Sequence, residues 1–150
     1  MTAGESVADE HHVLRYVRPS SIAGDGTING SEFRLRPDRP DDVGVSVSWM
    51  ECFDPPQANQ VSEVRRRTRL TLRRTGCFAR LNVGRVRSHV RTAVGSRISV
   101  VHDPLPVAGA FVADPAHSLL TGLPTGDSPE AEALGDLIAE CIGERFPAVE

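Results

Sequence analysis

The chain has 150 residues, of which 39% are apolar and 25% are charged, and its formal net charge is −3. This length and composition are typical of a single globular domain. The apolar runs fall well short of the roughly 18 residues that a membrane-spanning helix needs. Residues 1–12 contain three acids and no basic side chain, unlike a secretory signal. These features predict a soluble, cytoplasmic protein that does not associate with a membrane.

Charge is unevenly distributed along the chain. All 17 basic residues are arginines, which fits either a codon bias or selection for bidentate contacts to carboxylates and phosphates. Residues 61–100 hold 11 arginines and one acid, whereas residues 1–60 and 101–150 both carry a negative balance. This block structure indicates either internal pairing of basic and acidic faces or a basic patch for an anionic partner.

The three cysteines, Cys52, Cys77 and Cys141, lie far apart in the chain. An odd number of cysteines without short spacings matches neither a disulfide framework nor a zinc site. We therefore expect buried free thiols in a reducing compartment, and no cofactor is predicted.

The first third of the chain is expected to begin with a disordered tail over residues 1–11, because this stretch is polar and rich in small side chains. The apolar residues at 13–17 form an element too short for periodicity to distinguish helix from strand. Alternation of apolar and polar residues predicts strands at 32–36 and 43–51. The second of these has β-branched or aromatic side chains at every other position, which is the clearest strand pattern in the chain.

The middle third carries the arginine-rich segment. Apolar residues at helical spacing predict a helix near 57–66. Two alternating stretches, 68–74 and 77–83, flank a glycine and predict a β-hairpin. Valines spaced by three and four residues favour a helix at 85–94, followed by a strand at 97–102, although a second hairpin would also suit this valine-rich sequence.

The last third combines a loop-like stretch with a helix. Residues 103–127 are rich in proline and glycine, and unstructured segments of this length are often functional. Ser128 and Pro129 suit the first positions of a helix. One apolar stripe then predicts an amphipathic helix over 129–146.

Together these elements predict an α+β fold in a single small domain over residues 12–150. A mixed, mainly antiparallel sheet of about five strands is expected to pack against the C-terminal amphipathic helix and one or two further helices. The predicted core consists of apolar side chains from the inner faces of these elements: Val45, Val47, Trp49, Leu70, Leu72, Leu81, Val100, Leu137 and Ile138.

The first candidate site is an anion-binding surface within the basic segment 61–100. It consists of five arginines: Arg69, Arg73, Arg80, Arg85 and Arg87. Three lie on the polar face of the predicted hairpin. The other two follow Gly84, where the free amides of a helix start can hold a phosphate. A phosphate-loop motif is absent from the sequence, and the alternative is a solvated face that pairs with the acidic C-terminal helix.

The second candidate site is catalytic and combines two histidines with two carboxylates: His102, Asp103, Asp114 and His117. Such side chains suit a metal site, or an acid–base pair that cleaves a phosphodiester while an arginine steadies the developing charge. Each also has a structural interpretation. His102 shares the apolar face of its predicted strand, and Asp-Pro pairs commonly start turns.

The leading functional hypothesis is a non-enzymatic cytoplasmic binding domain that presents an arginine-rich surface to an anionic protein partner or to nucleic acid. The alternative is a small metal-dependent or histidine-based hydrolase or nuclease that uses residues 102–118. The enzyme hypothesis requires the two histidine rings to share one cleft. The binding hypothesis requires the five arginines to form one exposed patch.

Overall fold

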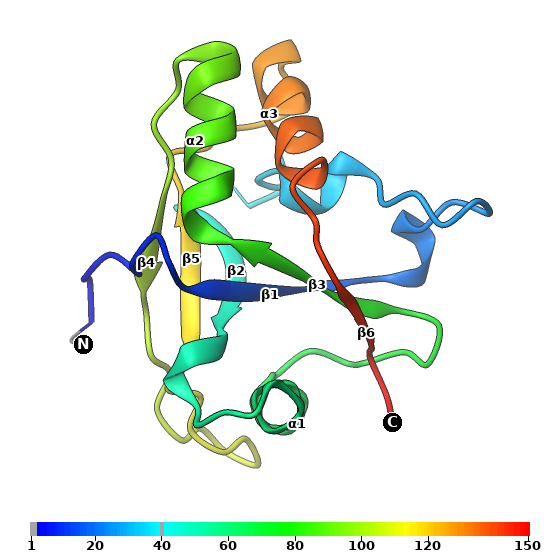
Figure 1. Cartoon of the computed structure of the whole chain (residues 1–150), viewed down its shortest axis with the longest axis vertical. Helices are drawn as coiled ribbons and strands as arrows, with labels where there is room; N and C mark the ends of the chain where they lie inside the picture. Colours follow the sequence, from blue (N-terminus) through cyan, green and yellow to red (C-terminus); the bar gives the residue numbers. More distant parts are fainter. Residues whose placement is uncertain (1–2, 40) are drawn as a thin grey trace.

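A six-stranded antiparallel sheet forms the centre of the protein in its computed structural model, which describes residues 3–39 and 41–150 (Figure 1). The strands follow one another in space in the order β4-β5-β2-β1-β3-β6. Their bounds are His12–Val17 (β1), Gly44–Trp49 (β2), Cys77–Asn82 (β3), Ser99–His102 (β4), His117–Thr121 (β5) and Arg145–Pro147 (β6). Each neighbouring pair is antiparallel. The α+β class is therefore confirmed, with six strands where about five are predicted.

Helices cover both faces of the sheet. The helices α2 (Val83–Val94) and α3 (Pro129–Ala139) lie side by side on one face, and α1 (Gln57–Arg67) lies on the opposite face (Figure 1). A large apolar cluster fills the space beneath α2 and α3, and a smaller one lies beneath α1. Within the described ranges, the helices are too short or too polar to cross a membrane.

Four elements form where the sequence predicts them. The predicted helices at 57–66 and 85–94 are α1 and α2, and the predicted strands at 43–51 and 97–102 are β2 and β4, with small shifts at their ends. Most of the predicted core is buried as well, with Trp49 and Leu137 partly buried at its margin. These elements have strong local patterns, and packing does not override them.

The ends of α2 are set by local chemistry. The Asn82 side chain accepts a hydrogen bond from the Arg85 amide at 2.8 Å, and Gly95 ends the helix in a left-handed conformation at φ 74°. Such caps satisfy backbone groups that helix ends leave free. They explain why the valine-rich stretch is a helix and not the second hairpin.

The strand predicted at 32–36 is wrong. A 3-10 helix, η2 (Gly30–Phe33), begins this stretch, and Asn29 caps it by accepting a backbone hydrogen bond at 2.9 Å. Phe33 and Leu35 are buried in the large cluster, which explains the alternating pattern. Their apolar faces pack beneath α3 and not within a sheet.

The predicted hairpin of 68–74 with 77–83 is also wrong. β3 forms, but it pairs with β1 and β6, while residues 68–74 are irregular and lie outside the sheet. Leu70 is 50% exposed and Leu72 is only partly buried, so neither is the core residue that the alternation predicts.

The last third of the chain forms two strands that the sequence does not predict. The C-terminal helix ends at Ala139, short of the expected 146, and the chain then returns to pair β6 with β3. β5 forms inside the 103–127 stretch and inserts between β4 and β2. β3 and β4, which α2 connects, are separated by β5, β2 and β1.

The N-terminal segment, for which the sequence predicts a disordered tail over 1–11, lies along the sheet edge; residues 1 and 2 are outside the described residues. Gly4 donates its amide to His102 O, and Val7 donates to Val100 O, each at 2.8 Å. Val7 is 2% exposed. The segment therefore covers the edge of β4 that would otherwise present unpaired backbone groups.

Gly135 on α3 and Gly30 on η2 allow these two helices to approach backbone to backbone. A Cβ atom on Gly135 would lie 2.5 Å from Gly30 O. Glycine-to-alanine changes inside helices normally stabilise by about 0.5–1 kcal/mol. Here the added methyl group must displace η2. We therefore expect Gly135→Ala to lower the free energy of unfolding by about 1–3 kcal/mol, measured by urea denaturation.

The exposed Ala133 on the same helix supplies a matched control. Ala133→Gly changes only helix propensity and is expected to lose about 0.5–1 kcal/mol. A Gly135→Ala variant that is more stable than the wild type would contradict the close approach of η2 and α3.

Candidate active site

The two predicted catalytic histidines project from opposite faces of the sheet. His102 lies opposite Ser118 in the β4-β5 register, and directly opposed side chains share a face, so His117 projects from the other face. His102 is 7% exposed, with Nε2 2.6 Å from Pro115 O and its ring edge-on to Trp49 at 5.5 Å. The histidines therefore share no cleft, and His102 is part of the packed interior.

A line of polar atoms joins His117 to Ser46 and Asp103. Nε2 of His117 lies 3.1 Å from Oγ of Ser46, which projects from the middle of β2. On the other side of the ring, Nδ1 lies 2.9 Å from the backbone oxygen of Asp103 and 3.2 Å from its carboxylate Oδ2. A serine, a histidine and an aspartate in this order are the groups by which a base activates a nucleophilic hydroxyl.

The contacts of Asp103 decide which ring nitrogen of His117 carries the proton in the neutral ring. A backbone carbonyl oxygen only accepts hydrogen bonds, so Nδ1 must donate to it. Nε2 then keeps its lone pair and accepts from the hydroxyl of Ser46. This is the tautomer in which His117 can take a proton from the serine.

Ser46 is accessible at a point where β1 and β2 separate. The pairing of the two strands ends at Leu14 and Ser48. Beyond it the Arg15 guanidinium lies where a neighbouring strand would be, and Nη1 donates to Ser46 O at 2.9 Å. Arg15 thus satisfies the strand edge without covering the serine side chain, which is exposed.

A cavity of about 150 Å³ opens beside Ser46 and His117. It lies between the sheet, the irregular residues 68–70 and the loop that follows β4, from which Leu105 and Asp114 contribute. The cavity gives the serine–histidine pair a space in which a small substrate group can meet it. We refer to this space as the Ser46 cavity.

Arg69 contributes a positive charge to the wall of the Ser46 cavity. Its guanidinium donates to Pro106 O and lies over the Phe111 ring, 5.6 Å from the centroid. Its Nε is buried and has no hydrogen-bond partner among the described residues. A buried, unpaired cationic N–H is costly. The positive charge of this guanidinium, in the wall of the cavity, is suited to an incoming oxygen atom.

Asp114 forms another part of the cavity wall. Its side chain is buried, and Oδ1 accepts a hydrogen bond from the Ala116 amide at 3.3 Å. Desolvation raises the pKa of this carboxyl group, while the charge of His117 and the Ala116 hydrogen bond oppose part of the rise. Burial therefore favours the neutral form of the Asp114 carboxyl group, which lies in the cavity wall near His117.

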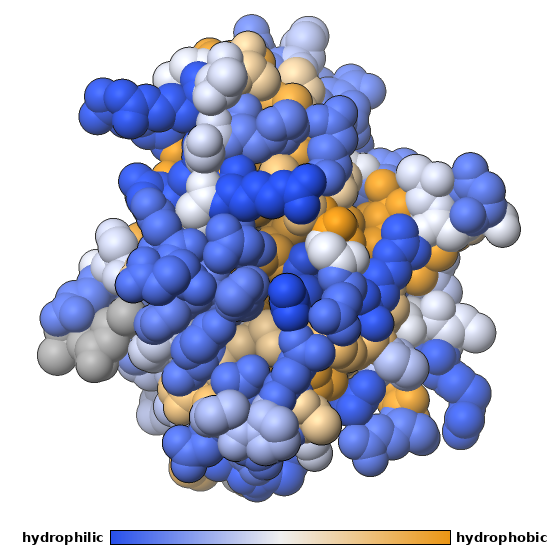
Figure 2. Space-filling view, viewed as in Figure 1, coloured by the Kyte–Doolittle hydropathy of each residue, from blue (hydrophilic) through white to orange (hydrophobic). Residues whose placement is uncertain are grey.

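The five arginines of the predicted anion-binding surface do not form one patch. Arg69 lies in the Ser46 cavity, while Arg80 projects from β3 toward Glu144 at 3.5 Å. On α2, Arg87 Nη1 pairs with Asp9 Oδ1 at 2.6 Å, and Arg85 is exposed. Arg73 is exposed in the irregular stretch 68–74. The face in Figure 2 carries hydrophilic side chains over most of its area, with smaller apolar areas between them.

The sequence predicts Asp103, Asp114 and His117 but misses Ser46. Ser46 stands at one of the polar positions of an alternating strand, where serine is an ordinary solvent-facing residue. Nothing in that pattern distinguishes it from Ser48. Within the described residues there is also no cluster of three or more His, Cys, Asp or Glu side chains arranged to hold a metal ion.

No protein family model, curated protein or solved structure matches this chain. The geometry of the site itself is therefore the basis for its function.

The raised pKa of Asp114 makes folding stability depend on pH. The stability that the protonated Asp114 contributes is fully present below the pKa of this group in the unfolded state. It is lost as the pH rises through the pKa of the group in the folded state. Asp114→Asn keeps the Oδ1 acceptor and cannot ionise. We expect this variant to be more stable than the wild type at pH 7, and the difference to vanish below about pH 4. Urea denaturation across this pH range measures it, and equal stability at pH 7 would contradict the cause assigned to the shift.

Proposed function

We propose that the protein is a small hydrolase in which Ser46 is the nucleophile, His117 the general base and Asp103 the group that orients the histidine. The observation that carries the proposal is the line of contacts from Ser46 Oγ to His117 Nε2, and from His117 Nδ1 to Asp103. It is a version of the histidine-based hydrolase considered from the sequence, with Ser46 in place of His102. The cytoplasmic location stays a prediction.

In the first half of the proposed reaction, Ser46 Oγ attacks the carbonyl carbon of an ester. The hydroxyl proton moves to His117 Nε2, and the carbonyl oxygen gains the negative charge of the tetrahedral intermediate. The positive charge of the Arg69 guanidinium, which lines the cavity, stabilises this oxygen. His117 then gives its proton to the leaving oxygen as the C–O bond breaks, which leaves Ser46 acylated and releases an alcohol.

In the second half, a water molecule attacks the acyl group on Ser46. His117 takes a proton from the water and returns it to Ser46 Oγ as the acyl bond breaks. The products are a carboxylic acid and the regenerated serine, so one ester and one water are consumed. The carboxylate of Asp103, 3.2 Å from Nδ1, stabilises the positive ring in both halves.

Covalent labelling tests the nucleophile directly. A fluorophosphonate probe is expected to modify Ser46, with loss of fluoride, and mass spectrometry of the digested protein locates the adduct. His117→Ala should slow labelling by about 10²–10⁴-fold, the usual contribution of a general base. Asp103→Asn should slow it as well, because it weakens the support of the positive ring. Hydrolysis of 4-nitrophenyl acetate should fall in parallel.

Ser48→Ala is the matched control, since Ser48 lines the same cavity from the same strand, and within the described residues its hydroxyl makes no hydrogen bond to His117 Nε2. It should be labelled like the wild type. Ser46→Ala removes an exposed hydroxyl, so its stability should change by no more than about 0.5 kcal/mol. Labelling that persists in Ser46→Ala, or a labelling rate that His117→Ala leaves unchanged, would exclude the proposed site.

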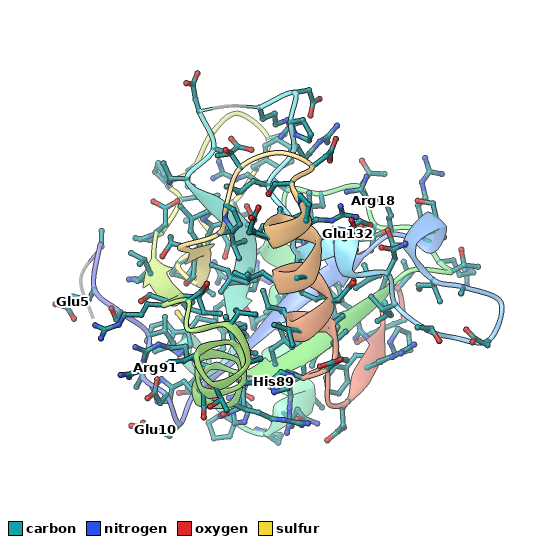
Figure 3. All side chains as sticks on the ribbon, turned by 90° about the horizontal axis from the view of Figure 1, so that it is seen from above. Glu5, Glu10, Arg18, His89, Arg91 and Glu132 are labelled. Carbon is teal, nitrogen blue, oxygen red and sulfur yellow. The ribbon has the colours of Figure 1, made fainter. Side chains whose placement is uncertain are left out.

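A second function, binding of an anionic protein or nucleic acid, is favoured by a polar pocket of about 320 Å³ between α2, the N-terminal segment and the two residues that precede β4. Arg87, Arg91 and Arg97 line it together with hydroxyl side chains. Arg91 and Arg97 make no side-chain hydrogen bond or ion pair with the residues that the structure describes. Figure 3 shows Arg91 and His89 on opposite sides of α2, with Glu10 on the N-terminal segment nearby.

Fluorescence anisotropy with a labelled DNA duplex tests this second function. The double variant Arg91→Gln/Arg97→Gln should weaken binding and reduce the slope of log affinity against log salt by about 2, because each phosphate contact contributes about one unit. Arg74→Gln, which removes an exposed arginine elsewhere, is the control. Equal affinity of the double variant and the control would exclude this pocket as the binding surface.

A further inference from the structure

Five arginines converge on a second pocket, of about 210 Å³, that meets the Ser46 cavity. They come from the end of β1 and from the loop that follows η2: Arg15, Arg18, Arg34, Arg36 and Arg39. Ser46 and Leu70 line both spaces, so the two join at the nucleophile of the proposed reaction. We call this second space the arginine pocket. All five arginines lie outside the basic segment that the sequence singles out.

Three of these arginines are held by neighbouring carboxylates. Glu32 accepts a hydrogen bond from Arg18 Nε at 2.8 Å and lies 3.6 Å from Arg15 Nη2. Arg36 pairs with Asp38 at 3.2 Å on the surface. These contacts fix part of the pocket wall in place and neutralise part of its charge.

The other two arginines are available. Arg34 and Arg39 make no side-chain hydrogen bond or ion pair with any described residue. Asp42 also lines the pocket, so five guanidinium groups stand against three nearby carboxylates, those of Asp42, Glu32 and Asp38. The pocket therefore keeps a positive charge that its own side chains do not cancel.

We infer that the arginine pocket binds a phosphate group of the substrate whose ester bond Ser46 attacks. The guanidinium fork matches phosphate oxygens and pairs with them bidentately, and two unpaired guanidinium groups suit a dianion better than a single carboxylate. The inference rests on the proposed hydrolase function and names its substrate class: a small phosphorylated ester whose carbonyl lies next to the phosphate-bearing part. Binding energy from this remote group would hold the carbonyl against the serine.

Titration of the full chain with inorganic phosphate at low ionic strength tests the pocket without any turnover. Calorimetry should give a dissociation constant at least 10-fold higher for Arg34→Gln/Arg39→Gln than for the wild type. Acetate, with one charge, should bind at least 10-fold more weakly than phosphate. The exposed control Arg74→Gln should bind phosphate within about twofold of the wild type, since Arg74 supplies no charge to the pocket.

The exposed Arg39→Gln alone serves if the double variant fails to fold, and it should weaken phosphate binding by about threefold or more. Phosphate should also slow fluorophosphonate labelling of Ser46 in the wild type, because the two spaces meet at this residue, and this protection should be lost in the double variant.

The results separate the two proposals. Weak phosphate binding in the wild type, or equal binding by the double variant, overturns the phosphate pocket even if Ser46 is labelled as expected. A second result is that the wild type binds phosphate through Arg34 and Arg39 while its Ser46 cannot be labelled. That result overturns the hydrolase function and keeps the anion site. Acetate binding as tight as phosphate overturns the choice of a dianionic group.

Discussion

The buried carboxylate of Glu32 is the constraint on which the candidate site depends. It is 3% exposed and accepts hydrogen bonds from Arg18 and from the hydroxyl of Ser21, each at 2.8 Å, with Arg15 at 3.6 Å. A carboxylate at this depth is tolerated only because cations and donors surround it, and loss of one partner would leave an uncompensated buried charge. Glu32 therefore helps to hold the Arg15 guanidinium in place beside Ser46 O.

The position of Arg15 shapes both spaces around Ser46. Its guanidinium donates to Ser46 O where the β1-β2 pairing has ended, so the strand edge is satisfied by a side chain instead of a neighbouring backbone. The Ser46 cavity with His117 and the arginine pocket both adjoin Ser46. The buried ion pair between Glu32 on η2 and Arg15 thus links the packing of η2 to the exposure of Ser46.

The sequence predicts the local elements well and the long-range ones poorly. The alternating valines of β2 and the capped, valine-spaced α2 form as expected, because their patterns and end residues act within a few positions. The segments 32–36 and 68–74 show equally regular alternation, but the first packs as η2 beneath α3 and the second lines cavities beside the sheet. Alternation records which side chains are covered, and it does not record whether a strand or another segment covers them.

The sequence by itself determines the α+β class, the charge asymmetry and three of the polar residues at the candidate site, since composition and short-range periodicity carry them. Only the tertiary structure decides that His102 and His117 face opposite sides, because this follows from the β4-β5 register. It also decides that Ser46 meets His117 across 71 residues of chain. Pairing between distant strands depends on how all the apolar faces are buried together, and no local pattern contains that information.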